Sequence, residues 1–358
     1  MYFRAWEHVL NEGKDGYYVP FKPLVSFSGK LTGDLLTAMN FLPKTGDIYD
    51  QAFQVDEYGY RNETGILNQP ISAVLLGTSF LGGAHETQDK LVNELLLHTY
   101  EIRTYNYATF PLQHFWEDER FIKSPPKYAI IIGSEGEILQ NSWIEVLQDT
   151  TVTHPVPAWK NYNEWNSLNN QFAFDYINVS KYAKRFSITK YYSQKISKEL
   201  LNTFLTREQI AYEFVKNGQY DPENKMIFFD VSAYDPRFNT TTQKAVEATV
   251  QTLVKTKKIL AKRNIKLLIV VMPGKDHLYA KKYKRLTPEK SALYVLQQQF
   301  EENQIEYIDM LSISSKIKKS TGQLLYYRDD SHWTTLVNEI IAKKIAEKLT
   351  DNELNREN

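Results

Sequence analysis

A short apolar run, Lys266 to Met272, constrains the fold of this chain most. It is followed by Pro273-Gly274, a pair that ends regular structure. A brief, continuously apolar segment closed by turn residues is typical of a strand buried on both faces of a parallel sheet. The preceding segment, Thr240 to Arg263, has its apolar residues at helical spacing. Helix followed by buried strand is the repeating unit of an α/β domain.

The same alternation continues on both sides of this unit. We expect a strand at Ile71 to Leu76, closed by Gly77 and followed by a helix at Gln88 to Leu97. The remaining expected strands are Tyr128 to Ile132, Met226 to Val231 and Glu306 to Asp309, and the remaining helices are Pro288 to Asn303 and Leu336 to Leu349. The predicted fold class is therefore α/β, a three-layer sandwich with a central parallel sheet.

Three segments depart from this pattern. Residues 1–70 are rich in Gly, Pro and Asn and are expected to form an opening segment of short strands and loops. Residues 140–225 hold several Trp and many Tyr and Asn, so we interpret them as an irregular, aromatic-rich insertion that could serve as a lid. The polar end, residues 351–358, is expected to fray. Residues 1–358 are expected to form a single domain.

Composition excludes several classes of function. The 43 basic and 43 acidic side chains cancel, so no net field attracts nucleic acid. Cysteine is absent, which excludes disulfides, thiolate metal sites and cysteine nucleophiles. No apolar run approaches the roughly 18 residues of a membrane span, and no secretory leader is visible, so a soluble chain is expected. The 24 Tyr and 6 Trp favour contact with carbohydrate, because such rings suit the apolar faces of sugars.

Ligands of open parallel sheets bind beyond the carboxyl ends of the strands. The first such end carries Gly77-Thr78-Ser79. A serine on a tight turn between strand and helix presents its hydroxyl to solvent, and free N–H groups at the helix start can hold an oxyanion. Ser79 is therefore a candidate nucleophile. The alternative is that Thr78 or Ser79 only caps the helix.

A serine nucleophile needs a base, and one of the seven histidines has two carboxylates within three residues of it. His332 stands in Asp329-Asp330-Ser331-His332-Trp333. Either Asp329 or Asp330 could hold the imidazole in one tautomer. Alternatively, the two carboxylates cap the last helix. These residues could also contribute to a metal site with His277 as a recruit, but no second histidine at helical spacing supports that interpretation, so no metal and no cofactor are expected.

Five motifs along the chain resemble those of the SGNH (GDSL-like) hydrolase superfamily, and within it the alginate O-acetyltransferase-like group of polysaccharide O-acetyltransferases. They are Gly13 to Tyr17, Asp56 to Asn62, Gly77 to Phe80, Val271 to Asp276 and Asp330 to Trp333. The resemblance implies an SGNH or flavodoxin-like sandwich with Ser79, His332 and Asp330 as the catalytic triad, because the block reads Asp-x-His. The chain departs from the group in two ways, since its serine precedes the Asp-His block and no glycine follows Trp333 closely.

The resemblance also supplies candidates for the rest of the site. Gly82 or Gly83, and Ser134, are candidates for the oxyanion hole. Arg61 and Lys275 are cations that could touch the substrate, and the alternative is that each is a solvated or structural charge. Trp333 is expected to wall the sugar site.

The function implied is transfer of an acetyl group, through an acyl-serine intermediate, onto a sugar hydroxyl of a bacterial polysaccharide. Relatives act outside the cytoplasmic membrane and often receive acetyl groups from a membrane-bound O-acyltransferase, so those partners and an extracytoplasmic location in the cell envelope are expected. Two alternatives stay open. One is a carbohydrate esterase or deacetylase that uses the same triad with water, and the other is a catalytically silent carbohydrate-binding relative.

Overall fold

The structure is a computed structural model that describes residues 26–32, 48–54, 56–58, 60–82, 87–107, 112–140, 147–149, 220–221, 226–228, 236–280, 283, 286–328 and 330–357. Most of the insertion expected over 140–225, with its lid, lies outside these residues and stays a prediction, as does the single-domain organisation. Short strands expected within residues 1–70 are present as an antiparallel pair, β1 (Ser26–Thr32) and β2 (Ile48–Gln54).

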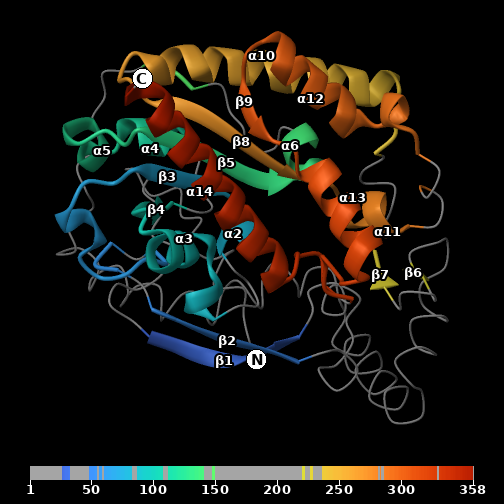
Figure 1. The fold of residues 1–358 in the computed structure, drawn as a ribbon, viewed down its shortest axis with the longest axis horizontal. Helices are drawn as coiled ribbons and strands as arrows, with labels where there is room; N and C mark the ends of the chain where they lie inside the picture. The colour runs from blue at the N-terminus through green and yellow to red at the C-terminus, as the bar shows by residue number, and fades with distance from the viewer. Residues whose placement is uncertain are drawn as a thin grey trace, which may run out of the picture.

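A five-stranded sheet forms the centre of the molecule (Figure 1). Its order is β4-β3-β5-β8-β9, and every neighbouring pair is parallel. In register, Gly77 lies opposite Ile132, and Ser134 opposite Met272, so the carboxyl ends of β3, β5 and β8 meet at one edge. The strands are β3 (Ala73–Gly77), β4 (Thr104–Asn106), β5 (Tyr128–Ser134), β8 (Lys266–Met272) and β9 (Glu306–Ile308).

Helices cover both faces of this sheet, which confirms the predicted α/β sandwich (Figure 1). One face packs against α4 (Leu112–Glu117), α5 (Glu119–Lys123), α6 (Glu135–Gln140), α10 (Thr240–Ala261) and α12 (Ala292–Glu302). The other packs against α2 (Ser79–Gly82), α3 (Val92–Tyr100), α11 (Lys275–Tyr279), α13 (Met310–Thr321) and α14 (Thr335–Glu357).

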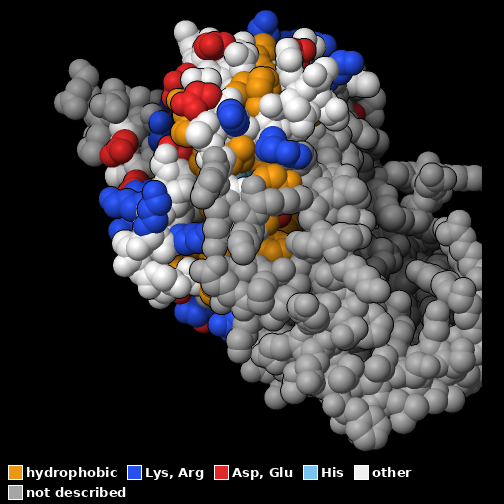
Figure 2. Space-filling model, turned by 90° about the vertical axis from the view of Figure 1, so that its right-hand side faces the viewer, with side chains coloured by type: hydrophobic (Ala, Val, Ile, Leu, Met, Phe, Trp, Pro, Cys, Tyr) orange, Lys and Arg blue, Asp and Glu red, His pale blue; other side chains and the backbone are white. Residues whose placement is uncertain are grey.

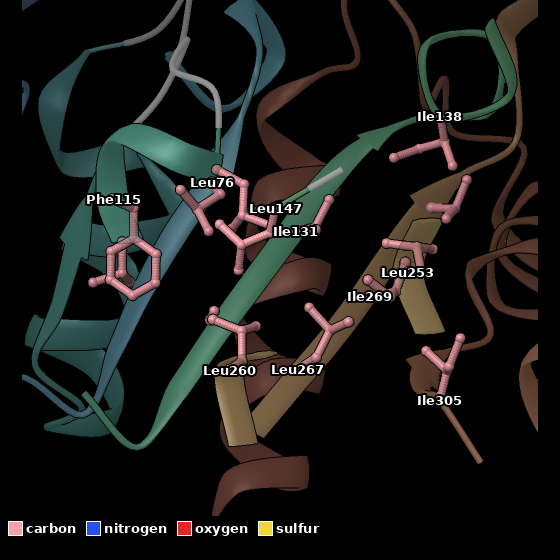
Figure 3. Close-up of a cluster of buried hydrophobic side chains, with 14 of the residues drawn as sticks. Leu76, Phe115, Ile131, Ile138, Leu147, Leu253, Leu260, Leu267, Ile269 and Ile305 are labelled. Carbon is pink, nitrogen blue, oxygen red and sulfur yellow. The ribbon is translucent and has the colours of Figure 1, made fainter. Parts of the chain in front are cut away.

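The continuous apolar run of β8 explains this layering. Side chains alternate between the faces of a strand, so Leu267 and Ile269 enter one core while Leu268 and Val270 enter the other. Figure 3 shows the first core, in which Leu253 of α10 lies beside the strand side chains. A strand buried on both faces must be apolar along its buried length, as this run is from Leu267 onward.

Helix starts follow the polar signals of the sequence. Asn239 accepts hydrogen bonds from Thr241 N and Thr242 N, and the Thr242 hydroxyl receives one from Asn239 N, which forms a capping box at the start of α10. Ser291 caps α12 and Asp309 caps α13 through the same kind of bond. These caps set the starts of the helices that bring the chain back across the sheet.

Several predicted elements need correction. The strand expected at Met226 to Val231 is β7 (Met226–Ile227), which pairs antiparallel with β6 (Tyr220–Asp221) and is not part of the central sheet. Strand β4 and helix α13 were not predicted. The polar end was expected to fray, but α14 continues to Glu357.

The described surface is mixed in charge. On the face shown in Figure 2, Lys and Arg side chains lie among Asp and Glu side chains. This mixture agrees with the balanced charge of the composition. Among the described helices, none is both long enough and apolar enough to cross a membrane.

Candidate active site

The turn after β3 needs a glycine at its first position. A Cβ on Gly77 would lie 2.4 Å from the carbonyl oxygen of Ile132 and 3.1 Å from the Cβ of Leu81. Only glycine lets β3, β5 and α2 approach this closely. Ser79 is the first residue of α2, directly beyond this turn. Its side chain is outside the described part of the structure.

Asp330 and His332 form a buried pair. The Nδ1 atom of His332 lies 2.6 Å from Oδ1 of Asp330, and the same oxygen accepts a hydrogen bond from the backbone N of His332 at 2.8 Å. Asp330 is 0 % exposed. A carboxylate on Nδ1 fixes the tautomer in which Nε2 can accept a proton and stabilises the imidazolium that results. Asp329, the other carboxylate that the sequence allows, lies outside the described residues.

The loop between α13 and α14 presents this pair. Tyr326 and Trp333 form an antiparallel bridge, and Tyr327 N donates to the carbonyl of His332 at 3.2 Å. The hydroxyl of Tyr326 donates to the carbonyl of Pro273 at 2.8 Å, beyond the end of β8. The loop is therefore closed on itself and tied to the carboxyl edge of the sheet.

Lys275 fixes the same loop from α11. Its Nζ donates to the carbonyl of Arg328 at 3.0 Å and to that of Asp330 at 2.7 Å. The side chain is buried, and the ammonium lies 5.8 Å from the ring centroid of Phe228. Hydrogen bonds from a charged donor are about twice as strong as neutral ones. Lys275 thus supports the backbone of Asp330. Its contact with a substrate stays a prediction.

Phe80 brings the serine turn and the histidine loop together. Its ring centroid lies 4.6 Å from that of His332 and 4.6 Å from that of Trp333. Phe80 directly follows Ser79, so the start of α2 lies beside the imidazole. Two motifs from opposite ends of the chain therefore meet at one edge of the sheet.

Trp333 lies behind the histidine in the core. It is 1 % exposed, and its Nε1 donates to Oδ1 of Asn338 at 2.7 Å. A ring covered in this way has no face for a sugar, which argues against the wall expected from the sequence. Its packing on Phe80 instead supports the position of the imidazole.

Ser134, the oxyanion candidate at the end of β5, is engaged by a carboxylate that the sequence analysis did not select. Both its N and its Oγ lie 2.9 Å from Oε2 of Glu137. The Thr78 side chain also bonds to Glu137. Burial raises the pKa of Glu137, and these hydrogen bonds, together with the charge of His332, act in the opposite direction. Glu137 thus connects the serine turn to the end of β5.

The remaining candidates are Arg61, Gly82 and Gly83. Arg61 is buried in the segment before β3, where its carbonyl accepts a bond from Nδ2 of Asn93 at 3.1 Å. Gly82 is the last residue of α2, and Gly83 lies outside the described residues. The structure brings Ser134 to the same edge as His332, since β5 lies between β3 and β8.

A second histidine and carboxylate pair lies at this edge. Nδ1 of His277 is 2.7 Å from Oε2 of Glu135, which also accepts the backbone N–H of Gly274 at 3.0 Å. Burial would lower the pKa of His277, but Glu135 and Asp276 together raise it. Burial, with the charge of Glu135, raises the pKa of Asp276 to about 6. In the sequence, Glu135 directly follows β5 and His277 lies shortly after β8. These positions after two neighbouring strands were the signal that could have predicted the pair.

Comparison with known families adds an independent finding. Residues 232–358 match the family described as the SGNH hydrolase-like domain of acetyltransferase AlgX. A search of curated proteins found no match. The matched region holds β8, the histidine loop and α14, and it does not include Ser79. The match confirms the superfamily resemblance, and with the five-stranded parallel sheet it places the fold in the SGNH-like α/β class.

Proposed function

We propose, from the premise that residues 232–358 belong to the SGNH hydrolase-like domain family of acetyltransferase AlgX, that this chain is a serine-dependent O-acetyltransferase. Its acceptor is a sugar hydroxyl of a bacterial polysaccharide. The observation that carries the proposal is the buried contact of 2.6 Å between Oδ1 of Asp330 and Nδ1 of His332. The imidazole lies beside the ring of Phe80, the residue that follows Ser79.

The first half-reaction forms an acyl-enzyme. Oγ of Ser79 attacks the acetyl carbonyl of the donor while Nε2 of His332 takes the hydroxyl proton. The carbon–oxygen bond to the leaving group then breaks, and the leaving group takes that proton. Asp330 stays ionised and stabilises the imidazolium in between. The backbone N–H of Ser79 and a second donor hold the oxyanion.

The second half-reaction returns the enzyme to its starting state. A sugar hydroxyl gives its proton to Nε2 of His332 and attacks the acetyl-serine carbonyl. The bond from Oγ of Ser79 to the acetyl carbon breaks, and Ser79 recovers the proton. Water in place of the sugar would give an esterase, so the balance between transfer and hydrolysis depends on which nucleophile reaches the intermediate. The acetyltransferase family of the matched region favours transfer.

The location and donor follow from the same family resemblance. We propose that the chain acts in the cell envelope, outside the cytoplasmic membrane, and receives acetyl groups through a membrane-bound O-acyltransferase. Fractionation of cells that express the chain, with an antibody to it, tests the location. Recovery of the chain only with cytoplasmic markers would contradict it.

The activity is tested with an aryl acetate as donor and an oligosaccharide as acceptor. We expect acetylated sugar, and an acetyl group on Ser79 detected by mass spectrometry of the quenched protein. Ser79→Ala should abolish the covalent adduct and lower the rate by at least about 10³-fold. Free acetate without acetylated sugar would support the esterase, and unchanged turnover in Ser79→Ala would overturn the serine mechanism.

A further inference from the structure

Three donor side chains converge on the surface beside α3, away from the histidine loop. Nε2 of His98 lies 2.7 Å from Oε1 of Glu63 and 3.4 Å from Oε2 of Glu94. The three donor atoms lie within 4.8 Å of one another. Glu94 and His98 are four residues apart on one helix face, a spacing that lets two side chains bind one ion.

Glu94 differs from an ordinary surface carboxylate because it is buried. Its side chain is 4 % exposed, whereas those of Glu63 and His98 are 43 % and 59 % exposed. Among the described residues, His98 is the basic side chain that both carboxylates contact. When the imidazole is neutral, the two carboxylates face each other, and a cation between them relieves that repulsion.

The buried carboxylate is also oriented from behind. Its Oε1 accepts hydrogen bonds from Nε2 of Gln88 at 3.0 Å and from Nδ2 of Asn93 at 3.1 Å. These bonds hold Oε1 inside and leave Oε2 directed toward His98. Outer hydrogen bonds of this kind fix the orientation of carboxylate ligands in metal sites.

We propose that Glu63, Glu94 and His98 bind one divalent transition-metal ion, and that zinc is the ion this donor set suits. Imidazole favours zinc over magnesium or calcium, which prefer oxygen ligands alone. Zinc lies about 2.0–2.2 Å from such donors, so the ring and the carboxylates need to part only slightly. Water fills the remaining coordination, since two of the ligands are at the surface.

An ion here would tie the segment before β3 to α3. That segment is already joined to the serine turn through amide side chains. Oδ1 of Asn62 accepts the N–H of Asn106 at 2.7 Å, and Nδ2 of Asn106 donates to the carbonyl of Leu81 in α2 at 3.4 Å. The site is therefore structural: it would stabilise the support of α2 and takes no part in the acyl-transfer chemistry.

Titration of the full chain with zinc chloride tests the proposal, after treatment with EDTA and desalting. Isothermal titration calorimetry should give one ion per chain, and the thermal midpoint should rise with zinc. His98→Gln and Glu63→Gln should each weaken binding by at least the roughly 10–100-fold that loss of an outer partner costs. Gln88→Met should weaken it by about tenfold, because it frees the buried carboxylate.

Asp89→Asn is the matched control. It removes the exposed carboxylate of Asp89, which lies next to Gln88 in the sequence and is not one of the proposed zinc ligands. It should bind zinc like the unmodified chain. Circular dichroism in EDTA should be the same for every variant, since the replaced ligands are partly exposed. Absence of saturable one-to-one binding in the unmodified chain would overturn the proposal. If His98→Gln and Glu63→Gln both bind zinc as tightly as the unmodified chain, the proposal is overturned as well.

Discussion

A single carboxylate oxygen determines how His332 is held. Oδ1 of Asp330 receives both the backbone N–H and the ring Nδ1 of the histidine, two residues further on. The side chain is fully buried, so solvent does not compete for these bonds. The imidazole is therefore fixed in position and tautomer by the same atom.

This geometry predicts the effect of Asp330→Asn on acetyl transfer. The amide oxygen can still accept the backbone bond, but the amide NH2 can donate to Nδ1 and select the wrong tautomer, and the neutral amide does not stabilise the imidazolium. We expect kcat to fall by about 10⁴-fold, as for the equivalent change in a serine triad, with little change in the thermal midpoint. Asp329→Asn, which alters the other carboxylate of the block, should keep kcat within a few fold. The reverse ranking in steady-state assays would assign the orienting role to Asp329.

At the level of residues, the sequence allowed part of the site to be predicted. His332 and its neighbouring carboxylates stood out because no other histidine has two carboxylates within three residues. Glu137 did not, because the first turn of α6 is needed to bring its carboxylate back to Ser134. The burial of Trp333 was also missed, since a tryptophan beside a catalytic histidine reads the same whether its ring faces solvent or the core.

At the level of elements, the histidine loop depends on α11. Lys275 donates to two loop carbonyls, at residues 328 and 330, so the first turn after β8 positions a segment that follows it by more than fifty residues. Tyr326 adds a bond from the loop back to Pro273. The end of β8 and the loop thus act as one structural unit.

Lys275→Met tests that dependence. Methionine keeps the length and the apolar stem but cannot donate, so one buried and one partly buried carbonyl lose their charged partner. We expect the free energy of unfolding to fall by about 1.5–3 kcal/mol and kcat to fall while KM changes little. Urea unfolding and steady-state kinetics measure both, with the exposed Lys290→Met as control. A rise in KM at constant kcat would instead indicate contact of Lys275 with the substrate.

Elements were predictable where apolar patterning is strong. Strand β8 matches its predicted bounds, because the residues that follow the half-buried Lys266 are all apolar and buried. Strand β4 was missed because its three residues carry no periodic signal. The run at Met226 was assigned to the sheet because apolar composition does not specify a strand's partner, and β7 pairs with β6 instead. Helix α13 was missed because Ser and Lys dilute its apolar face.

At the scale of the whole molecule, the site exists only because the chain returns to one sheet edge. The serine turn follows β3, the carboxylate Glu137 follows β5, and the histidine loop is tied to the end of β8. The sequence predicted this convergence from the rule that ligands bind at the carboxyl ends of parallel strands. It could not supply the ring contact of Phe80 with His332, which depends on side-chain packing between distant segments.

Asp276 and His277, which lie at this edge, make the free energy of unfolding depend on pH. Burial and the charge of Glu135 raise the pKa of Asp276 from its ordinary value of 3.8 to about 6, so the folded state holds a proton that the unfolded chain releases between these values. The free energy of unfolding therefore falls as pH rises from about 4 to 6, by about 3 kcal/mol in total. The raised pKa of His277 acts in the same direction, since its contribution is present below pH 6.5 and is lost as pH rises through its folded pKa.

Asp276→Asn should remove the first of these two effects, because the amide has no charge to desolvate. We expect the variant to be more stable than the unmodified chain by up to about 3 kcal/mol at pH 7.5 and equal to it near pH 3.5. Urea unfolding across this range measures the difference, and Asp351→Asn, at an exposed position of α14, should leave the pH profile unchanged. A variant that is less stable at pH 7.5 would mean that the ionised Asp276 is a net stabilising partner of His277. The ionised Asp276 would then oppose, and not cause, the loss of stability at higher pH.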